Sequence, residues 1–247
     1  MTVTVEVCID SIQSLSIAQQ AGADRIELCA SLKLGGLTPS MGTLNQAMQQ
    51  DRVPIYAIIR PREGDFVYSH DEAEVMLKDI ATARKTGCHG VVIGALRPDG
   101  TVDLTLLDAM LAEARGMGVT FHRAFDHCTE PMAALDALIA RPAVERILTS
   151  GGANHAEQGK ETLKAWVDYV RHTPLRIMPG AGITAHNAAE IIAHTGARDI
   201  HLSARTTQAS AAHTHAMATM GEGEKIGYPI TDPMQVRAVK QAVARFS

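Results

Sequence analysis

Two short Glu-x-Cys units lie near the start of the chain. They are Glu6-Val-Cys8 and Glu27-Leu-Cys29. Thiolates are ligands of soft metal ions, and two facing cysteines can hold such an ion with low coordination. Cys8 and Cys29 are therefore candidate metal ligands. The alternative is that both are small buried side chains without a ligand, because free cysteines are often core residues.

A second group of residues carries the side chains of acid–base chemistry. It consists of Glu27, Arg60, His122, Arg123 and Asp126. In an enzyme, Glu27 and His122 would serve as general base and general acid, and Asp126 would orient His122. Arg60 and Arg123 would stabilise an oxyanion. The structural alternative is that the two arginines form interior ion pairs with Glu27.

A third group is suited to bind an anion. In the segment 178–184, MPGAGIT, Gly180 and Gly182 lie where a predicted strand turns into a predicted helix. Backbone amides there would point outward at the positive end of the helix dipole. In many phosphate-binding barrels the loop after the next strand also contributes, and here that loop supplies Ser203 and Arg205. The alternative is that small residues simply allow a tight turn.

Strands and helices must bring these three groups of residues to one edge of the fold. Short β-rich apolar runs predict strands, and amphipathic stretches between them predict helices. The predicted strands cover 3–8, 25–29, 55–60, 90–94, 119–123, 145–149, 176–180 and 199–203, and the predicted helices cover 12–21, 40–50, 71–86, 104–116, 131–140, 157–172, 186–195 and 232–246. Strict alternation implies parallel strands with right-handed crossovers. Eight repeats favour a closed (β/α)8 TIM barrel, and the first strand lacks the glycine fingerprint of a dinucleotide-binding sheet.

The first two predicted strands indicate which side chains face the barrel interior. A carboxylate pressed against an apolar helix face would stay unpaired at a large cost, so Glu6 and Glu27 should point inward. Side chains alternate along a strand, so Cys8 and Cys29 share that face. Both cysteines end their strands, which places them at the carboxyl-terminal mouth where barrel enzymes keep their sites.

The bulk properties fit one cytoplasmic domain spanning 1–247. The composition of the 247 residues, 46% hydrophobic and 20% charged, suits a single α/β barrel. The net charge of -4 gives no field that gathers nucleic acid, and we find neither a secretory signal nor an apolar run of membrane-span length. Widely separated cysteines predict reduced thiols. The stretch 204–231 is expected to be a long loop, either a lid or the carrier of a short helix.

Several segments taken together resemble the CutC family of copper homeostasis proteins. The match runs from residue 3 to about 205 and rests, in order, on VEVCIDS, DRIELC, GGLTPSMG, IRPREGDFVYS, VVIGAL, TFHRAFD, RILTSGG, MPGAGI and HLSAR. The resemblance implies a (β/α)8 barrel, a cytoplasmic and often dimeric protein, and a role in binding monovalent copper through Cys8 and Cys29. Two residues depart from the family pattern: Ala181 stands where MPGGGI is usual, and Glu63 where RPRGGDF is usual.

Three functions remain open from the sequence. The first is binding of monovalent copper by a cytoplasmic homodimer. The second is an enzyme acting on a small phosphorylated metabolite, by isomerisation or by proton abstraction next to a carbonyl; no lysine ends a predicted strand, which argues against a Schiff-base aldolase. The third is a dimeric regulator or carrier that binds a metabolite. The expected partner is a copper ion or a small anion, and neither nucleic acid nor membrane.

Overall fold

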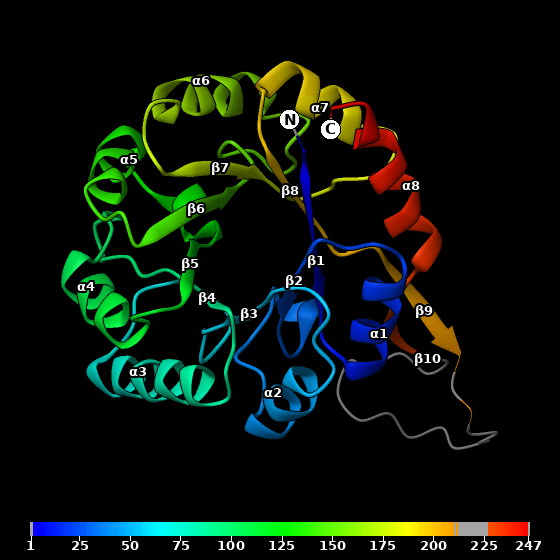
Figure 1. Cartoon of the computed structure of the whole chain (residues 1–247). Helices are drawn as coiled ribbons and strands as arrows, with labels where there is room; N and C mark the ends of the chain where they lie inside the picture. The colour runs from blue at the N-terminus through cyan, green and yellow to red at the C-terminus, as the bar shows by residue number, and fades with distance from the viewer. Residues whose placement is uncertain (1, 210, 212–226, 247) are drawn as a thin grey trace, which may run out of the picture.

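Eight parallel strands form the centre of the computed structural model, which describes residues 2–209, 211 and 227–246. The strands are β1 (Thr4–Ile9), β2 (Arg25–Leu28), β3 (Ile55–Ile58), β4 (Gly90–Ile93), β5 (Gly118–Phe121), β6 (Val144–Thr149), β7 (Arg176–Pro179) and β8 (Asp199–Leu202). Their order in the sheet is β7-β6-β5-β4-β3-β2-β1-β8, and Figure 1 shows the sheet curled into a barrel inside a ring of helices. The predicted (β/α)8 TIM barrel is confirmed.

A helix follows each of the first seven strands, and the last helix closes the chain. The helices are α1 (Ile12–Gln20), α2 (Met41–Met48), α3 (His70–Lys85), α4 (Leu104–Glu113), α5 (Pro131–Ile139), α6 (Lys160–Val170), α7 (Ala188–Thr195) and α8 (Pro233–Val243). The start of α3 is fixed by a capping box between Ser69 and Glu72. No helix among the described residues is both long and apolar enough to cross a membrane.

Side chains of the strands alternate between two separate cores. Val5, Val7 and Ile9 of β1 belong to the large core between strands and helices, whereas Cys8 belongs to a small cluster inside the barrel. Cys29 lies in the same interior cluster. The predicted register of the first two strands is therefore confirmed, and it brings both cysteines to one face.

The floor of the barrel is filled by one large ring. A Cβ atom added at Gly90 would lie 2.2 Å from the ring of Tyr56, and one added at Gly118 would lie 2.0 Å from its hydroxyl. The missing side chains on β4 and β5 thus make room for Tyr56, whose hydroxyl donates a hydrogen bond to Glu145 over 2.9 Å. Because the floor is closed by this ring, access to the interior is from the opposite, carboxyl-terminal end.

The stretch 204–231 contains a pair of strands that was not predicted. β9 (Arg205–Ala209) and β10 (Gly227–Thr231) form an antiparallel hairpin. In Figure 1 it extends past α1, away from the barrel wall. All of β9 is exposed and Pro229 interrupts the apolar pattern of β10, so neither strand carries the buried run by which the others were predicted. The expectation of a plain loop was wrong for both ends; the segment between the strands lies outside the described residues, apart from residue 211.

Candidate functional site

The two candidate copper ligands lie side by side at the mouth of the barrel. Cys8 is carried by β1 and Cys29 immediately follows β2, and their sulfur atoms are 3.9 Å apart. The residues are 2% and 1% exposed. With metal–sulfur bonds of about 2.3 Å, that separation corresponds to an S–metal–S angle of about 116°, close to that of a three-coordinate ion. The distance between the thiols therefore permits both to bind one ion with little movement.

Each thiol already has a hydrogen-bond acceptor. The Cys8 thiol donates to Oε1 of Glu27 over 3.0 Å, and the Cys29 thiol donates to the carbonyl oxygen of Ile9 over 3.2 Å. The contact with Cys29, together with burial, raises the pKa of the Cys8 thiol well above its ordinary value. Cys8 is therefore protonated at neutral pH, and a metal ion must displace its proton to bind.

A histidine of the neighbouring strand completes a cluster of possible ligands. His201 on β8 lies beside Cys8 and Glu27, and one ligand atom from each of the three falls within 4.8 Å of the others. Nδ1 of His201 is 2.8 Å from Oε1 of Glu6. Burial opposes ionisation of Glu6, but the charge of Arg25 and the contact with His201 hold the pKa of Glu6 well below its usual range. Ionised Glu6 can only accept, so Nδ1 of His201 donates to it. Although burial opposes it, the charges of Glu27 and Glu6 raise the pKa of His201, so a metal ion that binds at Nε2 must displace a proton there.

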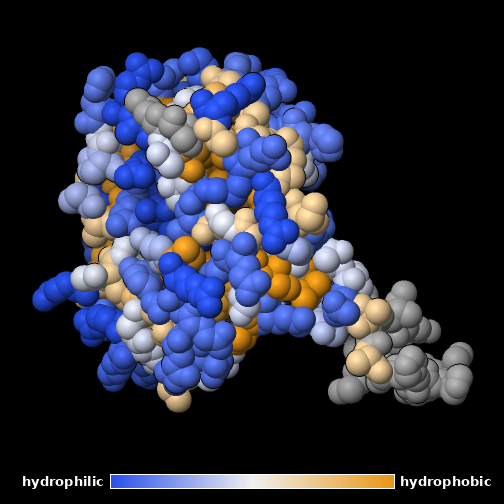
Figure 2. Space-filling model, turned by 45° about the vertical axis from the view of Figure 1, so that its right-hand side comes forward, coloured by the Kyte–Doolittle hydropathy of each residue, from blue (hydrophilic) through white to orange (hydrophobic). Residues whose placement is uncertain are grey.

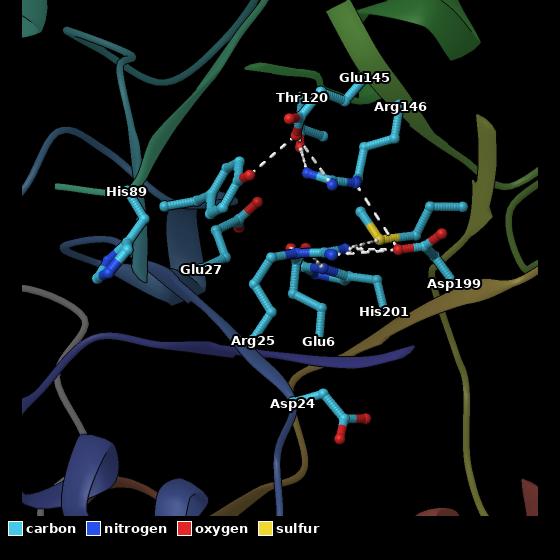
Figure 3. A network of polar contacts seen from close by, with 12 residues as sticks. Glu6, Asp24, Arg25, Glu27, His89, Thr120, Glu145, Arg146, Asp199 and His201 are labelled. Carbon is cyan, nitrogen blue, oxygen red and sulfur yellow. Dashed lines mark hydrogen bonds and ion pairs between the residues drawn. The ribbon is translucent and has the colours of Figure 1, made fainter. Parts of the chain in front are cut away.

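Below this cluster the barrel interior is charged. Arg25 forms ion pairs with Glu6 and with Asp199, and Arg146 lies near Asp199 as well. Figure 3 shows Arg25, Glu6 and His201 together, with Asp199 and Arg146 continuing the network. The two arginines balance the two carboxylates, which is what buried charges require. This network sets the position and protonation of His201 from below.

A cavity of about 220 Å³, here called the mouth cavity, opens above Cys8. It is lined by Cys8, Glu27, Leu32, Leu34, Gly35, Ile58, Arg60, Phe66, His122, Arg123, His127, Leu148 and His201. Among the described residues, Oε2 of Glu27, Nε2 of His122 and Nε of Arg60 are buried without a hydrogen-bond partner. Unpaired buried polar atoms are costly, and three around one cavity indicate a place for a polar ligand.

The pKa values of Glu27 and His122 are shifted in opposite directions. Burial raises the pKa of Glu27. Burial and the charge of Arg60 lower the pKa of His122 to about 3. Nδ1 of His122 accepts a hydrogen bond from the amide of Ala124 over 3.2 Å, so the neutral ring carries its proton on the unpartnered Nε2. His122 therefore presents a donor to the cavity, and Glu27 presents an acceptor.

Both predicted oxyanion arginines lie at the mouth, and within the described part of the chain no hydrogen bond or ion pair joins either of them to Glu27. Arg60 donates to the carbonyl oxygens of Leu34 and Gly64 over 2.8 and 3.0 Å. Arg123 is bound by Asp126 instead, over 2.7 Å. The structural alternative of Glu27–arginine ion pairs is thus wrong. The guanidinium of Arg60 is held by backbone oxygens, which leaves its charge uncompensated for an anionic ligand.

Asp126 does not orient His122, contrary to the sequence prediction. Its carboxylate accepts from the amides of Ser150 and Gly152, over 3.1 and 3.2 Å, and from the hydroxyl of Thr149. With Arg123 these donors satisfy the carboxylate fully. The sequence suggested the wrong partner because residues 123–127 form a short 3-10 turn, which directs Asp126 toward the end of β6. Asp126 shapes this loop and positions Arg123.

The loops after β7 and β8 enclose a second cavity, here called the anion pocket, of about 420 Å³. Its lining residues are Arg123, Ala181, Gly182, Ile183, Thr184, His201, Leu202, Ser203, Ala204, Arg205 and Gln235. Three of the four predicted anion-binding residues, Gly182, Ser203 and Arg205, are therefore brought together. Arg123 and His201 also line the mouth cavity, so the two cavities meet at these side chains.

Gly180 and the helix dipole do not contribute to the anion pocket, contrary to the sequence prediction. The amide of Gly180 donates to the carbonyl oxygen of Thr149 over 3.0 Å, as part of the barrel, and is not available to an anion. Helix α7 begins only at Ala188, and Oδ1 of Asn187 accepts from the amide of Thr184 over 2.8 Å. The predicted helix start was too early, so positive charge in the pocket comes from Arg123 and Arg205.

Comparison with known proteins gives the family of this chain. The family model described as "CutC family" matches residues 3–206. The chain belongs to the CutC family. A CutC protein of Photobacterium profundum is 48% identical over 98% of this chain and 100% of its own length, and that of Pasteurella multocida is 44% identical over 98% and 99%. The resemblance inferred from the motifs is confirmed.

Solved structures give the same result for the fold. The CutC of Streptococcus agalactiae, described as a candidate copper homeostasis protein, superposes with a TM-score of 0.76 at 30% identity, over 81% of this chain and 98% of that one. A phosphoribosylanthranilate isomerase from Pyrococcus furiosus reaches a TM-score of 0.57 at 14% identity, over 98% of this chain and 99% of that one. The second likeness concerns the barrel fold alone.

The two departures of this CutC chain from the family pattern lie in different surroundings. Ala181 lines the anion pocket and has a φ of 72°, a region that favours glycine. Glu63 is exposed, and its carbonyl oxygen accepts from Arg62 over 3.1 Å. Ala181 therefore affects the candidate site directly, whereas Glu63 lies on the surface.

The two remaining cysteines lie outside the candidate site. Cys88 packs in the core between strands and helices. Cys128 lines a separate hollow, with Arg97 and Thr101 among its neighbours. His201 is a residue of the candidate site to which the sequence had assigned no role. Its spacing, two residues after the buried Asp199, places it on the inward face of β8.

Proposed function

We propose that this CutC protein binds one monovalent copper ion in the cytoplasm through Cys8 and Cys29. The observation that carries the proposal is the 3.9 Å between their sulfurs at the mouth of the barrel. Two buried thiolates suit a soft monovalent ion, and the site opens to the mouth cavity, through which an ion can enter. The name of the Streptococcus agalactiae relative, which refers to copper homeostasis, also supports the proposal.

A competition titration tests it. Monovalent copper is added without oxygen, in the presence of a chromophoric chelator, to wild type and to a Cys8→Ser, Cys29→Ser double variant. A Cys88→Ser, Cys128→Ser double variant is the matched control, because it removes the same number of thiols. We expect one ion bound by wild type and control and none by the first variant; equal stoichiometry in all three would refute the proposal.

A second function is supported by a different observation. The mouth cavity and the anion pocket share Arg123 and His201. The mouth cavity is also lined by Glu27 and His122, each of which has a buried polar atom without a hydrogen-bond partner, Oε2 and Nε2. We propose as the alternative that a small phosphorylated metabolite binds with its phosphate near Ser203 and Arg205 and its reacting carbon beside Glu27. Glu27 would act as the base and neutral His122 as the proton donor. Arg60 and Arg123 would stabilise an oxyanion.

Binding of inorganic phosphate by calorimetry tests the anion pocket. Wild type is compared with Arg205→Ala and with Arg245→Ala, a control that removes the same charge from the last turn of the chain, where Arg245 stacks on Phe246. We expect phosphate affinity to fall at least tenfold for Arg205→Ala alone. If wild type binds no phosphate at millimolar concentration, the phosphorylated substrate is excluded.

We also propose that the protein is a homodimer. Tyr228 on the hairpin and Met234 at the start of α8 are 48% and 66% exposed, and Figure 2 shows apolar surface where the hairpin leaves the barrel. A contiguous exposed apolar surface is typical of protein interfaces. Light scattering after gel filtration tests this, with Tyr228→Ser, Met234→Ser expected to give monomers and Met132→Ser, an exposed methionine on α5, to leave the dimer intact.

A further inference from the structure

We propose that Cys8, Glu27 and His201 form a three-ligand site for a divalent ion of the zinc type, with a fourth position open to the mouth cavity. This site differs from the proposed copper pair because it uses His201 and Glu27 and excludes Cys29. The three ligand atoms lie within 4.8 Å of one another. The two sites share Cys8, so the two ions would compete.

The ligands come from rigid, adjacent elements. Cys8, Glu27 and His201 lie on β1, β2 and β8, which are consecutive in the sheet. The Cys8 sulfur and Oε1 of Glu27 are already 3.0 Å apart. Neighbouring ligand atoms of a tetrahedral zinc ion lie about 3.3–3.8 Å apart. Binding therefore requires side-chain rotations that move the ligand atoms by about 1 Å, without movement of the strands.

The surroundings of His201 are those of a metal-binding histidine. Zinc-bound histidines usually donate their second ring proton to a carboxylate, which fixes the ring and makes it a stronger ligand. Here Nδ1 of His201 donates to Glu6 over 2.8 Å, and Glu6, fully buried, is itself paired with Arg25. Figure 3 shows Glu27 and His201 on either side of the Arg25 and Glu6 side chains. Nε2 is thereby the ring nitrogen that would bind the ion, after release of the proton it carries in the charged ring.

The donor set and its charge select the ion. One thiolate, one imidazole and one carboxylate are the ligands of zinc, whereas magnesium and calcium take oxygen and monovalent copper prefers thiolates. A divalent ion with ionised Cys8 and Glu27 forms a neutral unit, which suits a buried site. Glu27 is only 4% exposed, and its Oε2, which has no hydrogen-bond partner among the described residues, adds a second carboxylate oxygen for the ion.

The vacant fourth position gives the ion a potential role beyond structure. Structural zinc sites use four protein ligands, whereas sites with three keep one position for water or substrate. Here the mouth cavity on that side is lined also by Arg60, His122 and Arg123. A small anion can therefore reach the ion from the cavity, with donors on its other side.

Cobalt substitution is the first test because it needs no variant. Divalent cobalt is added to metal-free wild-type protein, and the visible and near-ultraviolet spectrum is recorded. We expect intense bands of four-coordinate cobalt together with sulfur-to-cobalt charge transfer, and displacement of cobalt by zinc in equal amount. A weak, six-coordinate spectrum without charge transfer would overturn the proposal.

Matched variants then separate this site from the copper pair. Zinc affinity is measured with a chromophoric chelator for His201→Asn, Glu27→Gln and Cys29→Ser, each with circular dichroism as a check of folding. We expect the first two to lose zinc affinity at least 100-fold, about the upper limit of effects from outer-shell changes, while keeping monovalent copper. Cys29→Ser should keep zinc within threefold and lose copper. If Cys29→Ser loses zinc as His201→Asn does, the three-ligand site is wrong; if only copper binding fails in wild type, the copper proposal alone is wrong.

Discussion

Nη2 of Arg25 lies 3.0 Å from Oδ1 of Asp199, and this ion pair ties β2 to β8 across the interior of the barrel. Asp199 is fully buried, and Arg25 is 5% exposed. The same guanidinium pairs with Glu6 on β1, so one side chain joins three consecutive strands beneath the candidate metal ligands. A barrel usually fills this layer with branched apolar residues. Here charge takes their place and positions His201 through Glu6.

Removal of Arg25 should therefore be strongly destabilising. In Arg25→Met two buried carboxylates each lose one of their partners, and we expect the free energy of unfolding in urea to fall by about 3–5 kcal/mol. Lys164→Ala, which breaks the exposed pair with Asp168 on α6, is the control and should cost less than about 1 kcal/mol. A loss for Arg25→Met as small as that of the control would show that the interior charges do not stabilise the barrel.

The lowered pKa of His122 makes the stability of the folded protein depend on pH. Its pKa is lowered from 6.5 to about 3 in the folded protein, so below about pH 6.5 only the unfolded chain takes up this proton. Stability is thus lost as the pH falls from about 6.5 toward 3, with about 2 kcal/mol lost between pH 7 and pH 5. His122→Gln keeps an acceptor for the Ala124 amide but does not titrate.

Urea unfolding of both proteins at pH 7 and pH 5 measures this effect. We expect the difference in unfolding free energy between wild type and His122→Gln to shift by about 2 kcal/mol in favour of the variant at pH 5. An unchanged difference would mean that His122 titrates equally in the folded and unfolded chain.

Asp126 should contribute to stability without affecting His122. Asp126→Ala leaves Arg123 and the amides of Ser150 and Gly152 without their acceptor, and we expect a loss of about 2–4 kcal/mol in unfolding free energy. Because the hydrogen bonds of Asp126 go to the β6 loop and to Arg123 rather than to His122, the loss should be equal at pH 7 and pH 5. A loss that changes between these pH values would restore the predicted Asp126–His122 pair.

The sequence was sufficient for the fold and for the inward face of the first strands. Buried strands and amphipathic helices alternate at a regular spacing. Glu6 and Glu27 could be buried without a large loss of free energy only on the inward face of their strands. Partners within the mouth were harder to predict. The acceptor of Arg123, the free amide expected at Gly180 and the orientation of Asp126 depend on loop dihedral angles, which residue type and spacing leave undetermined.

Exposed elements and contacts between distant segments were missed for a related reason. The hairpin of β9 and β10 buries little, so no hydrophobic period indicates it. The pairing of Glu6 with His201 joins residues 195 positions apart, and it follows only once the closure of β8 onto β1 is known. The zinc-type cluster could therefore be inferred from the structure and not from the spacing of its ligands.

Ala181 offers a test of strain beside the anion pocket. Its φ of 72° lies in the left-handed region, which costs a residue with a Cβ atom about 1–2 kcal/mol. Ala181→Gly removes that cost but adds freedom to the unfolded chain, so we expect a net gain of about 0.5–1 kcal/mol in unfolding free energy. Ala193→Gly, an exposed position within α7, is the matched control and should lose about 1 kcal/mol. If both glycine variants lose stability alike, the turn after β7 is relaxed with alanine, and the usual glycine of the family at this position must serve the ligand rather than the backbone.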